Sequence, residues 1–189
     1  MRMMGRIVST GMVAAAVLAL AACGDDDKSD SGTQSASAAP HPTSQQAAPQ
    51  AKHGRECTAD DVKTTGGYGE APSITIPTDC DPPQQLIVKD LVTGTGPAAA
   101  PGQPLTMNYT LVSWSDGKKL DSSFDRNEPF QLTLGAGEVI PGWDQGLEGV
   151  TQGTRRLLIV PPDLGYGKGG RGIKPNETLV FVTDAVKVG

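Results

Sequence analysis

KKLDSSFDRNEPFQLTLGAGEVIPGW, residues 118–143, is the stretch that decides the fold. Phe130, Leu132 and Leu134 recur at every second position, which predicts a strand with one buried face. Further along, Pro141 stands near the start of a short segment that ends near Gly149, the arrangement expected of a helix of about two turns. The stretch therefore predicts a strand that leads into one short helix.

The sequence on both sides of this stretch predicts further strands. Leu105, Met107, Tyr109 and Leu111 alternate with polar residues, and Asp116-Gly117 then gives a strong hairpin-turn signal. Other strand-like runs cover residues 86–92, 155–160 and 179–188. Several antiparallel strands with one short helix predict an α+β fold, in which a sheet of five to six strands closes its apolar face over the helix. Residues 84–189 are long enough to form one core.

Three motifs in a fixed order carry a resemblance to a known family. They are Glu138-Val139-Ile140-Pro141-Gly142-Trp143, then PPDLGYG at 161–167, then TLVF at 178–181. In these motifs the chain resembles the FKBP-type peptidyl-prolyl cis-trans isomerases over residues 84–189. The resemblance implies an antiparallel half-barrel sheet wrapped around one short helix. It also implies a monomer that acts on X-Pro bonds, needs no cofactor and has macrolide inhibitors as a further ligand class.

The composition of residues 84–189 independently narrows the chemistry. This part of the chain contains no histidine and no cysteine, which excludes a Ser/His/Asp hydrolase and a His- or Cys-ligated metal site. GYGKGG at 165–170 matches a dinucleotide-binding pattern, but prolines on both sides leave no room for the helix that such a site requires. Prolyl isomerisation needs none of these groups. Its barrier is about 18–20 kcal/mol, and a thousandfold gain requires only about 4 kcal/mol.

The resemblance assigns roles to individual residues. As catalytic groups it implies Asp121 at the rim, held by Tyr109 and Arg126, the Ile140 N–H, and the Tyr166 hydroxyl, the last two binding substrate carbonyls. The expected floor and walls of the substrate pocket are Tyr109, Leu120, Phe130, Leu132, Val139, Trp143, Ile173 and Phe181. Leu120 and Leu132 stand where the family usually has phenylalanines, and the loop 168–176 is about two residues shorter than in small members. Within this loop, Arg171 and Ile173 are the best candidates for contacting substrate. Taken singly, each residue could equally be ordinary core, a turn residue or a loop anchor.

The N-terminus indicates export. Arg2 and Arg6 precede an uncharged stretch that is too short to span a bilayer, as in a signal peptide, here residues 1–22. It ends in Leu20-Ala21-Ala22-Cys23, which resembles a bacterial lipobox, so we expect a diacylglyceryl group on Cys23; ordinary secretion is the alternative. Residues 24–56 contain no large apolar side chain, so 23–56 is predicted to be a lipidated, disordered tether. His41 and His53 lie within it without supporting ligands and are not expected to bind metal.

Two cysteines remain after Cys23 is assigned to the lipid. Outside the cytosol Cys57 and Cys80 are expected to pair, with two free thiols as the alternative. We expect residues 57–83 to form a disulfide-closed extension that packs on the domain, with a short strand in SITIP at 73–77.

The sequence thus predicts an isomerase attached through a lipid to the outer face of a Gram-positive-like cell membrane. Its expected partners are unfolded or partly folded exported proteins that contain proline. Removal of residues 1–22 takes away two arginines and no acids, which moves the net charge from −5 to −7 and argues against nucleic acid as a partner. The alternative function is a non-catalytic module that binds prolyl segments or one partner protein through the same pocket.

Overall fold

The computed structural model describes residues 53–189. The predicted signal peptide, Cys23 and most of the tether lie outside the described residues. None of the helices within residues 53–189 is long and apolar enough to cross a membrane.

Eight strands and three short helical segments make up the described chain. In order they are β1 Lys63–Thr65, β2 Ser73–Thr75, β3 Ile87–Val92, β4 Pro104–Ser113, β5 Lys119–Ser122, α1 Ser123–Arg126, β6 Phe130–Thr133, α2 Pro141–Gly146, β7 Arg155–Val160, η1 Pro162–Leu164 and β8 Leu179–Val188. Strands β1 and β2 form a separate two-stranded sheet, and the other six form one antiparallel sheet.

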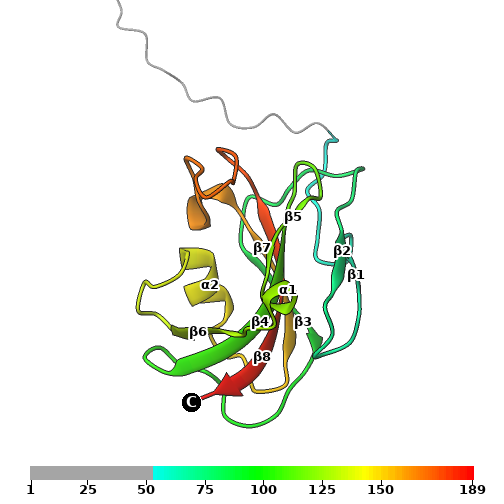
Figure 1. Cartoon of the computed structure of the whole chain (residues 1–189). Coiled ribbons are helices and arrows are strands. Elements are labelled where there is room, and N and C mark those ends of the chain that lie inside the picture. Colours follow the sequence, from blue (N-terminus) through cyan, green and yellow to red (C-terminus); the bar gives the residue numbers. More distant parts are fainter. Residues whose placement is uncertain (1–52) are drawn as a thin grey trace, which may run out of the picture. The chain divides into compact units, whose positions relative to one another are not determined.

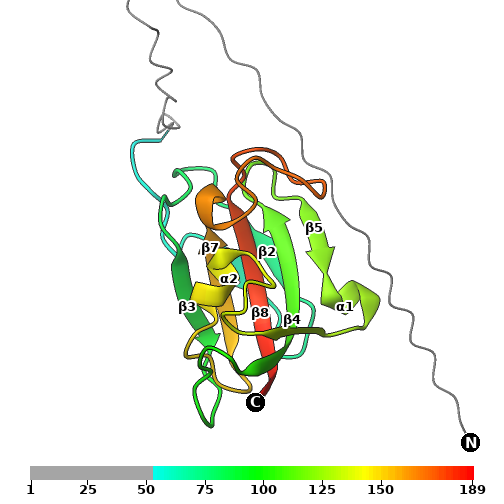
Figure 2. The same ribbon diagram turned by 90° about the vertical axis from the view of Figure 1, so that its left-hand side faces the viewer.

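The large sheet has the strand order β3-β7-β8-β4-β5, with β6 pairing the first half of β4. Helix α2 lies against one side of this sheet and the β1–β2 hairpin lies on the other (Figures 1 and 2). Because strand side chains alternate between faces, β7 contributes Leu158 and Val160 to the core under α2, and Leu157 and Ile159 to the core under the hairpin. All six β7 residues are therefore buried. The predicted α+β class, with an antiparallel sheet over a short helix, is confirmed.

Two glycines allow α2 to approach the sheet closely. A Cβ atom on Gly142 would lie 2.4 Å from Val160 Cγ1, and one on Gly146 would lie 2.8 Å from Leu158 Cδ2. Gly142 and Gly146 are one helical turn apart and both face β7. Their missing side chains let Trp143, which lies between them in sequence, enter the core.

The disulfide-closed extension covers the opposite face of the sheet. Cys57 and Cys80 are both buried and are joined in the predicted disulfide. Between them, Val62, Ile74 and Ile76 pack against the apolar side chains of β7 and β8. The extension therefore closes a second hydrophobic core that the sheet alone would leave open to water.

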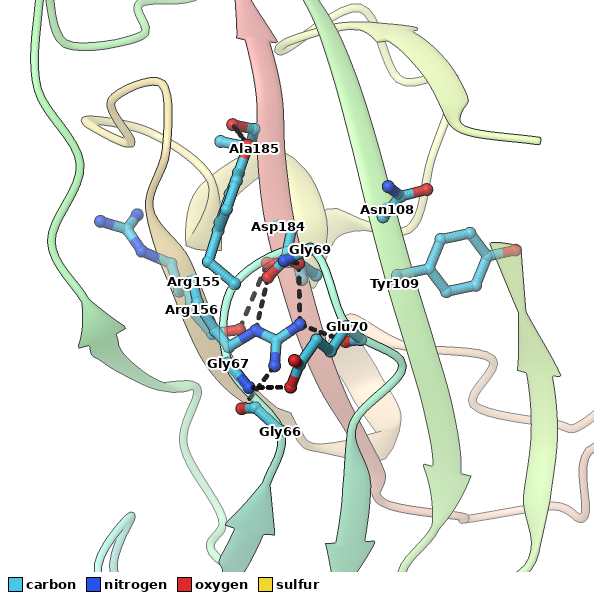
Figure 3. A network of polar contacts seen from close by, with 12 residues as sticks. Gly66, Gly67, Gly69, Glu70, Asn108, Tyr109, Arg155, Arg156, Asp184 and Ala185 are labelled. Carbon is cyan, nitrogen blue, oxygen red and sulfur yellow. Dashed lines mark hydrogen bonds and ion pairs between the residues drawn. The ribbon is translucent and has the colours of Figure 1, made fainter. Parts of the chain in front are cut away.

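A buried ion pair ties the extension to the sheet (Figure 3). Arg155 Nε and Asp184 Oδ1 are 2.6 Å apart, and their side chains are 2% and 1% exposed. The same guanidinium donates hydrogen bonds to the backbone oxygens of Gly66 at 2.7 Å and Glu70 at 2.6 Å, while Asp184 Oδ2 accepts one from the N–H of Gly69 at 2.7 Å. The loop between β1 and β2 is thus fixed to β7 and β8.

Three features differ from the sequence prediction. Strand β1, which pairs with β2, was not expected, because its sequence KTT shows no alternation of apolar and polar residues. Helix α1 has a single turn, too short for a periodic pattern. The predicted tether extends to residue 56. In the structure, however, the His53 N–H donates to the Asp81 carboxylate, and Glu56 forms an isolated β-bridge with Asp81. The ordered extension therefore begins before residue 57. These contacts involve backbone and polar groups, which hydrophobic patterning does not detect.

Candidate active site

A cavity of about 170 Å³ lies on the α2 side of the sheet. Strands β4, β5, β6 and β8, helix α2 and the loops before α2 and after η1 all contribute to its wall. The lining residues are Tyr109, Leu111, Asp121, Phe130, Glu138, Val139, Ile140, Trp143, Tyr166, Arg171 and Phe181.

The floor of the cavity is a cluster of four aromatic rings centred on Trp143. The ring of Trp143 lies 5.4 Å from that of Tyr109, 5.9 Å from Phe130 and 5.5 Å from Phe181, in edge-to-face arrangements. Trp143 is only 4% exposed, and its indole nitrogen is the one buried side-chain polar atom within residues 53–189 that has no hydrogen-bond partner. Apart from this indole N–H, the floor is an apolar surface.

One polar network closes the rim of the cavity. The Tyr109 hydroxyl donates to Asp121 Oδ2, and Arg126 donates to Asp121 Oδ1 and, at 3.0 Å, to the Tyr109 oxygen. Partial burial acts to raise the pKa of Asp121, but the hydrogen bonds from Tyr109, Arg126 and the Ser122 N–H outweigh it and hold the pKa below its usual range. Burial and the bond to Asp121 raise the pKa of Tyr109. Asp121 is therefore ionised and Tyr109 protonated near neutral pH.

The two hydrogen-bond donors that the resemblance assigns to substrate carbonyls have no partner among residues 53–189. The Ile140 N–H precedes α2 and donates to no group, although the Ile140 carbonyl accepts from Trp143 and Asp144. The Tyr166 hydroxyl, in the loop after η1, likewise bonds to nothing. A ligand in the cavity would therefore find an apolar floor and two unused donors.

Eight of the predicted site residues line this cavity and three do not. Phe130 pairs with Met107 on β4, two residues from the cavity residue Tyr109. Leu132 is buried and pairs with Leu105, which is two residues further from Tyr109. Leu120 and Ile173 pack against the core beside the cavity without lining it. The resemblance implied a pocket role for Leu132, whereas alternation along the strand identifies only the face that it shares with Phe130.

The sequence analysis missed Leu111 and Glu138. Leu111 shares the alternation phase of Tyr109, so the same strand pattern could have indicated it. Glu138 directly precedes the apolar wall residues Val139 and Ile140, and nothing in the sequence pattern indicated that this carboxylate would line the cavity.

A second cavity, of about 320 Å³, lies at the far end of the sheet. It is larger, but it contains no aromatic ring and neither of the free donors. Its lining is Pro104, Leu105, Thr106, Gln131, Leu132, Thr133, Glu138, Lys187 and Gly189. The cavity over Trp143 is therefore the better candidate for the active site.

Comparison with known proteins agrees with this geometry. The family model described as FKBP-type peptidyl-prolyl cis-trans isomerase matches residues 96–185. The chain is 46% identical over 122 residues to an FK506-binding protein of Streptomyces anulatus, covering 63% of this chain and 98% of that protein. It is 48% identical over 89 residues to the peptidyl-prolyl cis-trans isomerase Fkbp12 of Drosophila melanogaster, covering 46% of this chain and 82% of that protein.

Solved structures show the same fold. The crystal structure of AtFKBP13 matches with a TM-score of 0.51 and 34% identity, covering 55% of this chain and 93% of that chain. FkpA from Escherichia coli matches with a TM-score of 0.51 and 38% identity, covering 55% of this chain and 47% of that chain.

Proposed function

Because this chain belongs to the FKBP-type peptidyl-prolyl cis-trans isomerase family and is a peptidyl-prolyl isomerase, we propose that the cavity over Trp143 is where it accelerates X-Pro rotation in exported proteins. The observation that carries this proposal is the combination of an aromatic floor with two unused donors, the Ile140 N–H and the Tyr166 hydroxyl. The relatives are named FK506-binding proteins, and we include macrolides of that kind as ligands in the proposal.

The mechanism follows from the charge distribution of the amide. Resonance stiffens the C–N bond and places negative charge on the carbonyl oxygen, and the twisted transition state loses part of that charge separation. Transfer of the imide from water to the apolar floor therefore costs the ground state more than the transition state. Reaching about 10 turnovers per second requires about 4 kcal/mol. In this mechanism the two donors orient the peptide and no proton is exchanged with the protein.

The lipid anchor is a second part of the proposal. Support comes from the sequence Leu20-Ala21-Ala22-Cys23 after an apolar stretch and from the disulfide in the described extension, a bond typical of proteins outside the cytosol. A protein held in this way at the outer face of the membrane meets other chains as they emerge and before they fold. The proposed substrates are proline-containing segments of such chains.

The test is a protease-coupled assay on a neutral prolyl tetrapeptide, with Tyr166→Phe as the variant that removes one free donor. We expect the parent protein to accelerate isomerisation and the variant to lower kcat/KM about five- to tenfold, since one hydrogen bond to the substrate contributes about 1 kcal/mol or slightly more. Circular dichroism checks that the variant is folded. Binding of the peptide without acceleration would instead show the non-catalytic module.

A further inference from the structure

Three charged residues line the catalytic cavity, and only one of them lacks a partner. Asp121 is paired with Arg126. Glu138 accepts a hydrogen bond from the Thr133 N–H at 2.9 Å and also lines the second cavity, so its carboxylate is directed toward β6. Arg171 also lines the catalytic cavity, and its guanidinium forms no hydrogen bond or ion pair with any residue between 53 and 189. The cavity therefore contains one cationic group with no counter-charge.

Arg171 is presented by a tight two-residue turn. Gly170 and Ile173 exchange backbone hydrogen bonds of 3.0 and 2.9 Å, with Arg171 and Gly172 between them. Both central residues have positive φ, 54° for Arg171 and 81° for Gly172, as in a type I′ turn. This turn favours Asn or Gly at its first central position, so an arginine is strained there. Backbone strain of this kind is commonly retained at functional sites, which makes the choice of residue informative.

The loop that contains this turn is held at both of its sides. Lys174 Nζ lies 2.9 Å from Asp116 Oδ2 in the turn after β4, and Glu177 accepts hydrogen bonds from the N–H and hydroxyl of Ser115 at 2.8 and 2.7 Å. The N–H of Asn176 also donates to the Gly167 oxygen at 2.8 Å, which closes the loop beside Tyr166. These contacts hold the loop backbone that carries Arg171 beside the cavity, and the exposed Arg171 side chain makes none of them.

We propose that Arg171 is a specificity-determining residue that favours substrates with an acidic residue immediately before the proline. The proposal rests on the proposed function, and it takes the imide carbonyl to be the group that the Tyr166 hydroxyl orients. That carbonyl belongs to the residue before the proline, and Arg171 is on the same loop as Tyr166. A carboxylate on that residue meets the unpaired guanidinium, whereas a lysine is repelled by it.

The test compares capped peptides of the form Ala-Xaa-Pro-Phe, acetylated and amidated so that Xaa carries the only charge. Isomerisation rates are measured by exchange NMR, without a coupling protease that has its own sequence preference. For Xaa as Glu, Gln and Lys we expect kcat/KM to fall in that order. The Glu peptide should exceed the Gln peptide by about two- to fivefold, the range for an ion pair at an exposed rim. In 1 M salt, where screening acts over about 3 Å, the difference should nearly disappear.

Two variants separate this role from a structural one. Arg171→Asn removes the charge and suits the turn, so we expect unchanged or higher resistance to urea together with equal rates on the Glu and Gln peptides. Lys168→Gln removes a positive charge from the same loop at a position that does not line the cavity, and should keep the preference for Glu.

The proposal is overturned if the parent protein treats the Glu and Gln peptides alike, if Arg171→Asn keeps the preference, or if Lys168→Gln abolishes it. Acceleration of the Gln peptide without any charge preference overturns this inference and leaves the isomerase function intact. A failure to accelerate all three peptides overturns both.

Discussion

Asp184→Asn should lower the stability of this protein more than most single substitutions, although Asp184 does not line the cavity. The substitution keeps the shape of the side chain and removes its charge. Arg155 would then be a buried cation, 2% exposed, whose remaining partners are all neutral: the carbonyl oxygens of Gly66 and Glu70 and the introduced amide oxygen. Removing one member of a buried pair typically costs about 3–5 kcal/mol, because the other charge stays desolvated. Domains of this size unfold with about 5–15 kcal/mol, so a large share of the stability is lost.

The assay is urea unfolding followed by tryptophan fluorescence. With a slope of about 1.5 kcal/mol per M, a loss of 3–5 kcal/mol lowers the midpoint by about 2–3 M. Asp125→Asn is the matched control, because it makes the same chemical change in the pair with Lys119, whose two side chains are both 52% exposed. We expect that control to cost less than about 1 kcal/mol. Equal, small shifts for the two variants would refute the argument that burial makes the Arg155 pair important.

Three further outcomes are expected. The kcat/KM for a neutral prolyl peptide should vary less than about twofold from pH 6 to 8. The reason is that the pKa of Asp121 is lowered below its ordinary 3.8, so the carboxylate loses its charge only as pH falls through that lower value. A bell-shaped dependence of kcat/KM on pH between 6 and 8 would instead show an essential acid or base. Trp143→Ala should cost about 3–5 kcal/mol in urea unfolding, since it empties the centre of the aromatic cluster; a loss under 1 kcal/mol would mean that the ring is not a core residue. Cys23→Ala should release the protein into the medium or leave an unprocessed precursor, and unchanged partitioning into detergent would disprove the lipid anchor.

Much of the fold could be predicted because its strands carry strong alternation. The predicted limits of β7 and β8 agree with the structure, since both strands are rich in β-branched and other apolar residues and turn residues precede and follow them. The register could not be predicted, because pairing such as Leu105 with Leu132 depends on contacts between distant segments. The same limit applies to Leu132, whose partner on β4 the sequence does not specify.

The site could be predicted in its residue types but not in its electrostatics. The ordered motifs identified Trp143, Ile140 and Tyr166, and the structure brings them together. Arg171 and Ile173 were equal candidates for substrate contact in the sequence. Only the turn between Gly170 and Ile173 shows that Arg171 lines the cavity while Ile173 packs against the core.

The extension that covers the second face of the sheet also makes the stability of the protein depend on the oxidation of Cys57 and Cys80. The family model matches residues 96–185 and leaves residues 57–83 outside, and this outside segment completes the second core. Before Cys57 and Cys80 are oxidised, the extension lacks a crosslink that contributes about 3 kcal/mol, and the apolar back of β7 and β8 is less securely covered. Under the export proposed above, the reduced precursor in the cytosol would be less stable and easier to unfold for translocation. Oxidation outside the cytosol would then stabilise the folded state.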